Sequence, residues 1–106
     1  MTEDLRKRIA DTIARGHVML FMKGNPAMPQ CGFSAAVVSI LKQAGVAFES
    51  YNILADPELR EGLKEYSSWP TFPQLYVDSK LVGGADIVRD LHTKGELAQL
   101  LSATHA

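Results

Sequence analysis

The residues of this sequence with the clearest chemical capacity form the segment Cys31-Gly32-Phe33-Ser34, which contains the chain's single cysteine. The segment follows a loop with two prolines and precedes a pattern typical of a helix. The sulfur is therefore predicted near the unpaired N–H groups and the positive end of a helix dipole, which stabilise a thiolate. A thiolate can act as a nucleophile or as a metal ligand. A lone cysteine is more often an inert buried residue, but this one follows a stiff turn, so we expect a reactive Cys31.

Composition limits the chemistry that this thiol can perform. The chain has 106 residues, 46% of them apolar, and a net charge of -1, which predicts one compact domain over residues 1–106. A single cysteine cannot form an internal disulfide and favours a reducing compartment. The longest apolar run, Val18–Met22, is far shorter than a membrane span, and no signal segment precedes it, so we expect a cytoplasmic protein. The one basic cluster, Arg6-Lys7-Arg8, lies among acids and indicates a solvated helix face, so no nucleic acid is expected.

The first half of the chain predicts a helix, a strand, a second helix and a second strand. Apolar residues recur at helical spacing over residues 5–13, and Gly16 is expected to end that helix. Val18–Met22 has the pattern of a buried strand. An apolar stripe then predicts a helix that ends at Gly45, and residues 48–53 form the next strand. The stripe consists of Phe33, Val37, Ile40, Leu41 and Ala44. Strand, helix and strand at this spacing make a βαβ unit, whose strands should be parallel.

The second half predicts a helix, a hairpin and a final helical region. Asp56-Pro57-Glu58 has the pattern of a helix start, and Leu59, Leu63 and Tyr66 are expected to be its buried face. Residues 74–77 and 80–82 are short β-prone runs that predict an antiparallel hairpin. The final helical region is broken near Gly95. Together these elements predict an α/β fold, a thioredoxin-like three-layer α/β/α sandwich around a four-stranded mixed sheet.

Four short segments, taken together, carry a more specific pattern. They are Met22-Lys23-Gly24, Pro29-Gln30-Cys31-Gly32-Phe33-Ser34, Trp69-Pro70-Thr71-Phe72-Pro73-Gln74, and Val82-Gly83-Gly84 with Asp86-Ile87. In this order they resemble the monothiol glutaredoxins of the CGFS type. The resemblance implies a glutaredoxin fold, glutathione as a ligand and a 2Fe-2S cluster shared between the subunits of a homodimer. It also implies delivery of that cluster in iron-sulfur protein assembly, at most weak thiol reductase activity, and BolA-type and apo iron-sulfur proteins as partners.

The resemblance assigns roles to individual residues. Cys31 would be the cluster ligand and the catalytic thiolate, while Lys23 and Arg60 would supply cations for the carboxylates of glutathione. Phe72 would pair its backbone with the cysteinyl unit, next to a cis peptide bond, and the start of the last helix would hold the γ-glutamyl end. The full expected binding set is Lys23, Phe33, Arg60, Thr71, Phe72, Pro73, Gly84, Ala85 and Asp86.

Simpler interpretations of these residues remain open in the sequence. Lys23 is equally typical of a solvated strand end, and Arg60 of one more charge on an exposed helix face. Phe33 occupies the apolar stripe, and Trp69 and Phe72 are also typical packing aromatics. The three histidines show no metal-ligand spacing and are expected at the surface.

The absence of a second cysteine excludes some redox chemistry. Ser34 stands where dithiol glutaredoxins have a cysteine, and Ala85 where many CGFS proteins have another. No dithiol mechanism and no internal redox switch is therefore available. Three functions remain: a cluster carrier, a glutathione-dependent thiol-disulfide oxidoreductase, and a thioredoxin-like interaction module with an unreactive cysteine.

Overall fold

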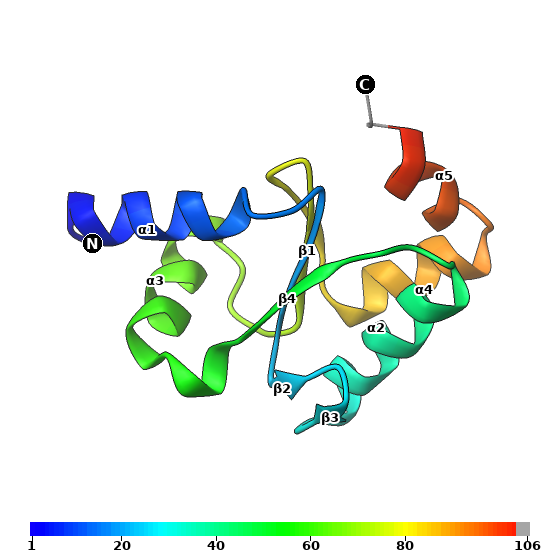
Figure 1. Ribbon diagram of the computed structural model, residues 1–106, viewed down its shortest axis with the longest axis horizontal. Helices are drawn as coiled ribbons and strands as arrows, with labels where there is room; N and C mark the ends of the chain where they lie inside the picture. Colours follow the sequence, from blue (N-terminus) through cyan, green and yellow to red (C-terminus); the bar gives the residue numbers. More distant parts are fainter. Residues whose placement is uncertain (104–106) are drawn as a thin grey trace.

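A four-stranded sheet forms the centre of the molecule in a computed structural model that describes residues 1–103 (Figure 1). The strand order is β4-β1-β5-β6. The strands are β1 (Val18–Met22), β4 (Glu49–Asn52), β5 (Gln74–Val77) and β6 (Lys80–Gly83). Strand β1 is parallel to β4 and antiparallel to β5, and β5 is antiparallel to β6. The predicted mixed sheet, with its parallel βαβ unit and its hairpin, is confirmed.

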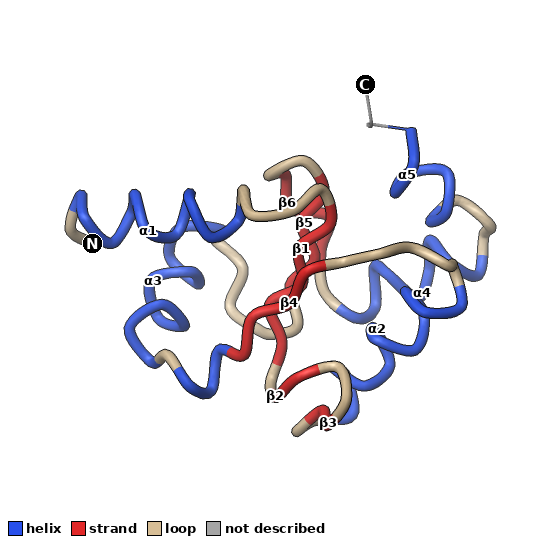
Figure 2. Tube along the Cα trace, viewed as in Figure 1, coloured by secondary structure: helices blue, strands red, loops and turns tan. Residues whose placement is uncertain are grey.

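Helices cover both faces of this sheet, as Figures 1 and 2 show. The helices α1 (Glu3–Ile13) and α3 (Pro57–Ser67) lie on one side of it. The helices α2 (Gly32–Gln43), α4 (Ala85–Thr93) and α5 (Leu97–Ala103) lie on the other. The three-layer α/β/α sandwich is therefore confirmed. None of the helices in residues 1–103 has the length and apolar character that crossing a membrane requires.

Strand β1 separates two apolar cores. All five of its residues are buried, and successive side chains point to opposite faces, as in any β-strand. Met19 and Phe21 join the core beneath α1 and α3. Val18, Leu20 and Met22 join the core beneath α2 and α4. The continuous apolar run that predicted a buried strand thus serves both layers.

Side-chain caps fix where the helices begin. Thr2 accepts a hydrogen bond from the Leu5 N–H at the start of α1. Asp56 does the same for Leu59 at the start of α3, where Pro57 occupies the first turn as predicted. Cys31 is itself the N-cap of α2, so the fold places the thiol at the end of a helix.

Some expectations about local structure are wrong. The first helix ends at Ile13 with an αR cap at Ala14, before Gly16. Gly16 is instead a close-approach position, because a Cβ there would lie 2.7 Å from Glu49 Cγ. Tyr66, expected on the buried face of α3, is 38% exposed, because it lies beyond Leu63, the last residue of α3 that joins the core.

Two short elements were not predicted. A hairpin of β2 (Gly24–Asn25) and β3 (Met28–Pro29) lies in the loop before Cys31, and a 3-10 turn, Ile53–Ala55, follows β4. Gly24 adopts φ +89°, and a Cβ there would lie 2.6 Å from the Met28 carbonyl oxygen, so the tight hairpin requires glycine. The hairpin presents the segment that leads into α2.

Candidate functional site

The Cys31 thiol lies partly buried at the N-terminus of α2, where backbone donors face it. The Ser34 N–H donates to Sγ over 3.4 Å, and the Ser34 hydroxyl oxygen lies 3.7 Å from Sγ. That hydroxyl is fully buried and also accepts the Lys23 N–H over 3.1 Å. Ser34 therefore joins the end of β1 to the thiol at the start of α2.

The environment favours the thiolate. Burial alone raises the pKa of Cys31, but hydrogen bonds from the Ser34 N–H, the Ser34 hydroxyl and the Phe33 N–H oppose this effect, and so does the charge of Lys23. The hydrogen bonds and the charge together outweigh burial, so the pKa of Cys31 lies below its ordinary value. The site thus favours the thiolate, the form that acts as a nucleophile or a metal ligand.

A groove of about 640 Å³ lies beside this thiol and draws its walls from both helical layers. The lining residues are Lys23, Phe33, Arg60, Lys64, Trp69, Pro70, Thr71, Phe72, Pro73, Gly84, Ala85, Asp86 and Ile87. All nine residues expected from the sequence to bind a ligand are among them. Cys31 itself does not line the groove, although Phe33, two residues along the chain, does.

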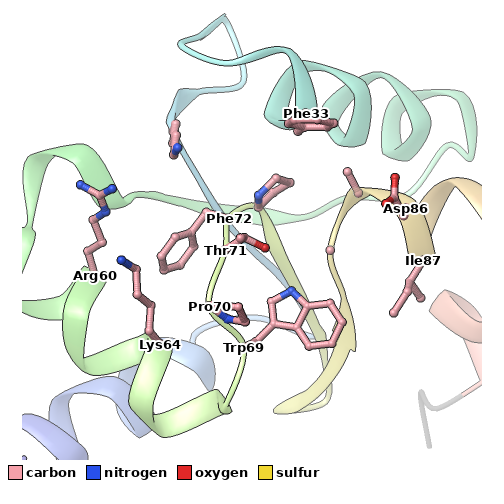
Figure 3. A pocket seen from close by; sticks show the side chains of 13 residues that line it. Phe33, Arg60, Lys64, Trp69, Pro70, Thr71, Phe72, Asp86 and Ile87 are labelled. Carbon is pink, nitrogen blue, oxygen red and sulfur yellow. The ribbon is translucent and has the colours of Figure 1, made fainter.

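The two ends of the groove differ in charge (Figure 3). Arg60 and Lys64 project from α3 at one end, and Arg60 Nε is buried without a hydrogen-bond partner among the described residues. Lys64 Nζ lies 3.1 Å from Glu61. At the other end Gly84 is the N-cap of α4 and supplies no side-chain cap, and the Asp86 side chain is 93% exposed. The free N–H groups of a helix start favour a carboxylate, and Asp86 offers a counter-charge for an ammonium group.

The segment between β5 and α3 forms the floor of the groove. Trp69, Pro70 and Thr71 are at least partly exposed there, whereas Phe72 is 6% exposed and packs into the core beneath α1 and α3. The Phe72-Pro73 bond is cis, as the resemblance implied. Gly84 lies directly beside this segment, where a Cβ would lie 3.2 Å from Trp69 Nε1.

Comparison with known proteins identifies the family. Residues 18–82 match the glutaredoxin family. The chain is 48% identical over 106 residues to a monothiol glutaredoxin, ycf64-like, from Synechocystis, covering 100% of this chain and 99% of that protein. It is 54% identical to probable monothiol glutaredoxin 2 of Rickettsia typhi, covering 90% of this chain and 86% of that protein. The chain belongs to the monothiol glutaredoxin family.

Longer relatives and solved structures agree with this assignment. Monothiol glutaredoxin-S11 of rice is 57% identical over 94% of this chain, which spans only 20% of the rice protein. The solution structure of reduced poplar apo GrxS14 superposes with a TM-score of 0.80 at 49% identity, covering 93% of this chain and 91% of that one. The holo form of poplar glutaredoxin C1 gives a TM-score of 0.87 at 23% identity, over 98% of this chain and 92% of that chain, which shows a shared fold.

Sequence reasoning missed four residues that line the groove of this glutaredoxin. Lys64 follows Arg60 by four residues on α3, so helical spacing alone would have placed the two cations on one face. Trp69, Pro70 and Ile87 complete the walls. Phe33 is 58% exposed, so its interpretation as a core residue is wrong: it lies on the first turn of α2 and faces the groove.

The histidines lie away from the groove of this glutaredoxin. His17 is more covered than expected, because its ring contacts Asp78 Oδ1 at 2.6 Å and the Leu101 carbonyl oxygen at 2.5 Å. His92 contacts Gln43, and His105 lies outside the described residues. Among residues 1–103 no three His, Cys, Asp or Glu side chains gather in a way that could hold a metal ion.

Proposed function

We propose that this monothiol glutaredoxin binds glutathione in its groove and, as a homodimer, carries a 2Fe-2S cluster that it delivers in iron-sulfur protein assembly. The observation that carries the proposal is the charge pattern of the groove beside a stabilised thiolate. Glutathione is an extended tripeptide with a carboxylate at each end and one ammonium group. The groove offers cations at one end and an uncapped helix start with an acid at the other.

The charge pattern suggests one orientation for glutathione. The glycyl carboxylate would lie at the α3 end, where the Lys23 ammonium can meet it together with Arg60 Nε, which has only a 4.0 Å ion pair with Glu61 and no hydrogen bond among the described residues. The γ-glutamyl carboxylate would accept hydrogen bonds from the start of α4, and its ammonium would pair with Asp86. The cysteinyl unit would then pass the backbone of Phe72, which supports the roles implied by the family resemblance.

The number of ligands supports a dimer. A 2Fe-2S cluster takes four ligands, usually thiolates, while each chain has one cysteine. No other ligating cluster is present among residues 1–103. Two Cys31 thiolates and two glutathione thiolates complete the set. In this proposal the protein carries the cluster and passes it to apo iron-sulfur proteins. A BolA-type protein can replace one subunit of the dimer.

The decisive experiment is anaerobic reconstitution with iron, sulfide and glutathione. Wild-type protein should become brown with visible charge-transfer absorption. Cys31→Ser should retain its far-ultraviolet dichroism but remain colourless, because an oxygen is a poor substitute for a thiolate on iron. Ser39→Ala, which alters an exposed residue of the same helix, should load like wild type. A brown Cys31→Ser protein would overturn the proposal.

The lowered pKa of Cys31 favours a second candidate, a glutathione-dependent thiol-disulfide oxidoreductase. Cys31 would attack the glutathione sulfur of a mixed disulfide and release the substrate thiolate. A second glutathione thiolate would then attack the Cys31 disulfide, regenerating Cys31 and forming glutathione disulfide. Turnover by cluster-free protein at the rate of a dithiol glutaredoxin would favour this candidate. Either activity suits a reducing compartment, and we propose the cytoplasm, although two relatives, from Saccharomyces cerevisiae and Lachancea kluyveri, are named as mitochondrial.

A further inference from the structure

Gln74, the first residue of β5, is a fully buried polar side chain directly behind the groove floor. Its Nε2 donates to the Trp69 carbonyl oxygen over 3.0 Å and to the Thr71 carbonyl oxygen over 3.3 Å. Its Oε1 accepts the Tyr76 hydroxyl over 3.0 Å. The buried amide group thus donates two hydrogen bonds and accepts one, all within the protein.

The loop that Gln74 contacts is held by side chains and not by backbone–backbone hydrogen bonds. In the part of the chain that the structure describes, no backbone–backbone hydrogen bond involves residues 69–72. Pro70 and Pro73 have no N–H to donate. Besides Gln74, Ser67 holds the start of this loop: its Oγ accepts the Trp69 N–H over 3.1 Å and lies 3.5 Å from the Trp69 carbonyl oxygen. Phe72 is held by its packing in the core, whereas the Trp69 and Thr71 carbonyls are both bonded by the amide behind them.

The chemistry of this contact requires an amide. Carbonyl oxygens only accept hydrogen bonds, so the group that faces Trp69 and Thr71 must offer two donors. The opposite side of the same group must accept the Tyr76 hydroxyl, whose pKa burial raises to about 12, so it remains a donor at neutral pH. Gln74 meets both requirements, and an apolar residue of similar size would remove its amide donors from both loop carbonyls and its acceptor from the buried Tyr76 hydroxyl.

We propose that Gln74 is the positioning residue for glutathione: its amide holds the Trp69–Phe72 loop in the conformation in which the loop forms the groove floor. Gln74 does not line the groove and acts only through the loop. The inference rests on the proposed binding of glutathione, which it deepens by assigning the residue that shapes the site.

The test compares three variants for binding, stability and loop conformation. Gln74→Leu removes both loop contacts. Tyr76→Phe removes the hydroxyl but leaves both amide donors on the loop, and the double variant removes the whole network. Gln99→Leu makes the same change at an exposed position on α5 and serves as the matched control. Glutathione affinity is measured by NMR titration, stability by urea unfolding, and loop conformation by acrylamide quenching of Trp69, the chain's one tryptophan.

The expected result separates positioning from stability. Gln74→Leu should weaken glutathione binding about tenfold and increase quenching of Trp69. Tyr76→Phe should lose stability and keep its affinity. The double variant should regain stability relative to Gln74→Leu, because no buried hydroxyl is left unpaired, yet bind as weakly as Gln74→Leu. Equal affinity in Gln74→Leu and wild type, or affinity that follows stability across the three variants, would overturn the inference.

The failure of the proposed function would look different. Wild-type protein that shows no shifts with glutathione would overturn glutathione binding itself. Trp69 quenching still decides whether Gln74 holds the loop, because that measurement needs no ligand. Unchanged quenching in Gln74→Leu would then reject the positioning role as well.

Discussion

Ser34 shows how much one buried hydroxyl can control in this protein. It accepts a hydrogen bond from the Lys23 N–H, lies 3.7 Å from the thiol and contributes its own N–H to Sγ. The residue that replaces a second cysteine is thus part of the environment of the first. Because position 34 is a serine and not a cysteine, the protein lacks dithiol chemistry. The same serine hydroxyl stabilises the remaining thiolate.

At this residue, Ser34→Ala should raise the pKa of Cys31, because a donor to the thiolate is lost while burial remains. The thiolate fraction at pH 7 should fall. The variant should also lose about 1–2 kcal/mol of stability, since the Lys23 N–H is left without its acceptor. Thiolate absorption at 240 nm against pH measures the first effect. Lys23→Met should raise the pKa less, because the charge of Lys23 is the smallest contribution; a larger effect of Lys23→Met would contradict this ranking.

Gly84 offers a second test at the residue scale. Its backbone approaches Trp69 Nε1 and the Pro73 carbonyl so closely that a Cβ would lie 3.2 Å and 3.3 Å from them. Gly84→Val should displace Trp69 and weaken glutathione binding about tenfold or more. Gly32→Val is the control, because nothing lies within 4 Å of a Cβ at that position. Titration with glutathione compares them, and similar losses in both variants would show that crowding at Gly84 is not the cause.

At the scale of elements, the start of α3 is fixed by a network around Asp56. Arg8 Nη1 donates to its carboxylate over 2.8 Å, the Tyr51 hydroxyl over 2.6 Å and the Leu59 N–H over 3.1 Å. These bonds join α1, β4 and α3 at one carboxylate. The Arg8 guanidinium, with the Tyr51 hydroxyl and the Leu59 N–H, holds the pKa of Asp56 well below its usual range.

Asp56→Ala should therefore lower the free energy of unfolding at pH 7 by about 2–3 kcal/mol, through loss of the cap and of charge-assisted bonds. A depressed folded pKa means that this stabilisation is complete above the unfolded value of about 3.9 and is lost as pH falls toward the folded pKa. Wild-type protein should thus lose more stability than Asp56→Ala below about pH 4. Urea unfolding at pH 7 and pH 3 tests this. Asp11→Ala, which breaks an exposed pair with Lys7, should change little.

The elements that the sequence predicts well are those long enough to show a burial pattern. Residues 5–13 bury one face at helical spacing, and Val18–Met22 is a continuous apolar run that is buried throughout. The β2–β3 hairpin was not predicted, because strands of two residues are too short to show an alternating pattern. Phe33 fits the stripe of α2 by spacing, but its turn extends past the sheet and faces the groove. The groove residues are predictable from the family motifs, whereas the contacts of Gln74 and Ser34 depend on distances that only the fold provides.

At the scale of the whole molecule, one cysteine per chain means that the proposed cluster would need ligands from more than one molecule. We expect a cluster-loaded dimer in native mass spectrometry with glutathione present, and colourless monomer after its exhaustive removal, because noncovalently held ligands leave. A loaded monomer, or a dimer that keeps its cluster without glutathione, would show that other ligands complete the site.

The groove also draws its walls from both sides of the sheet: Arg60 and Lys64 from α3, Phe33 from α2 and Asp86 from α4. A ligand that touches all four spans two cores that otherwise meet only through β1 and its neighbours. Such a ligand acts as a removable cross-link. At 100 times its dissociation constant it adds about 2.7 kcal/mol of stability by mass action. Hydrogen exchange should then slow in α3 and α4 together, so that the two layers open as one cooperative unit only while the groove is filled.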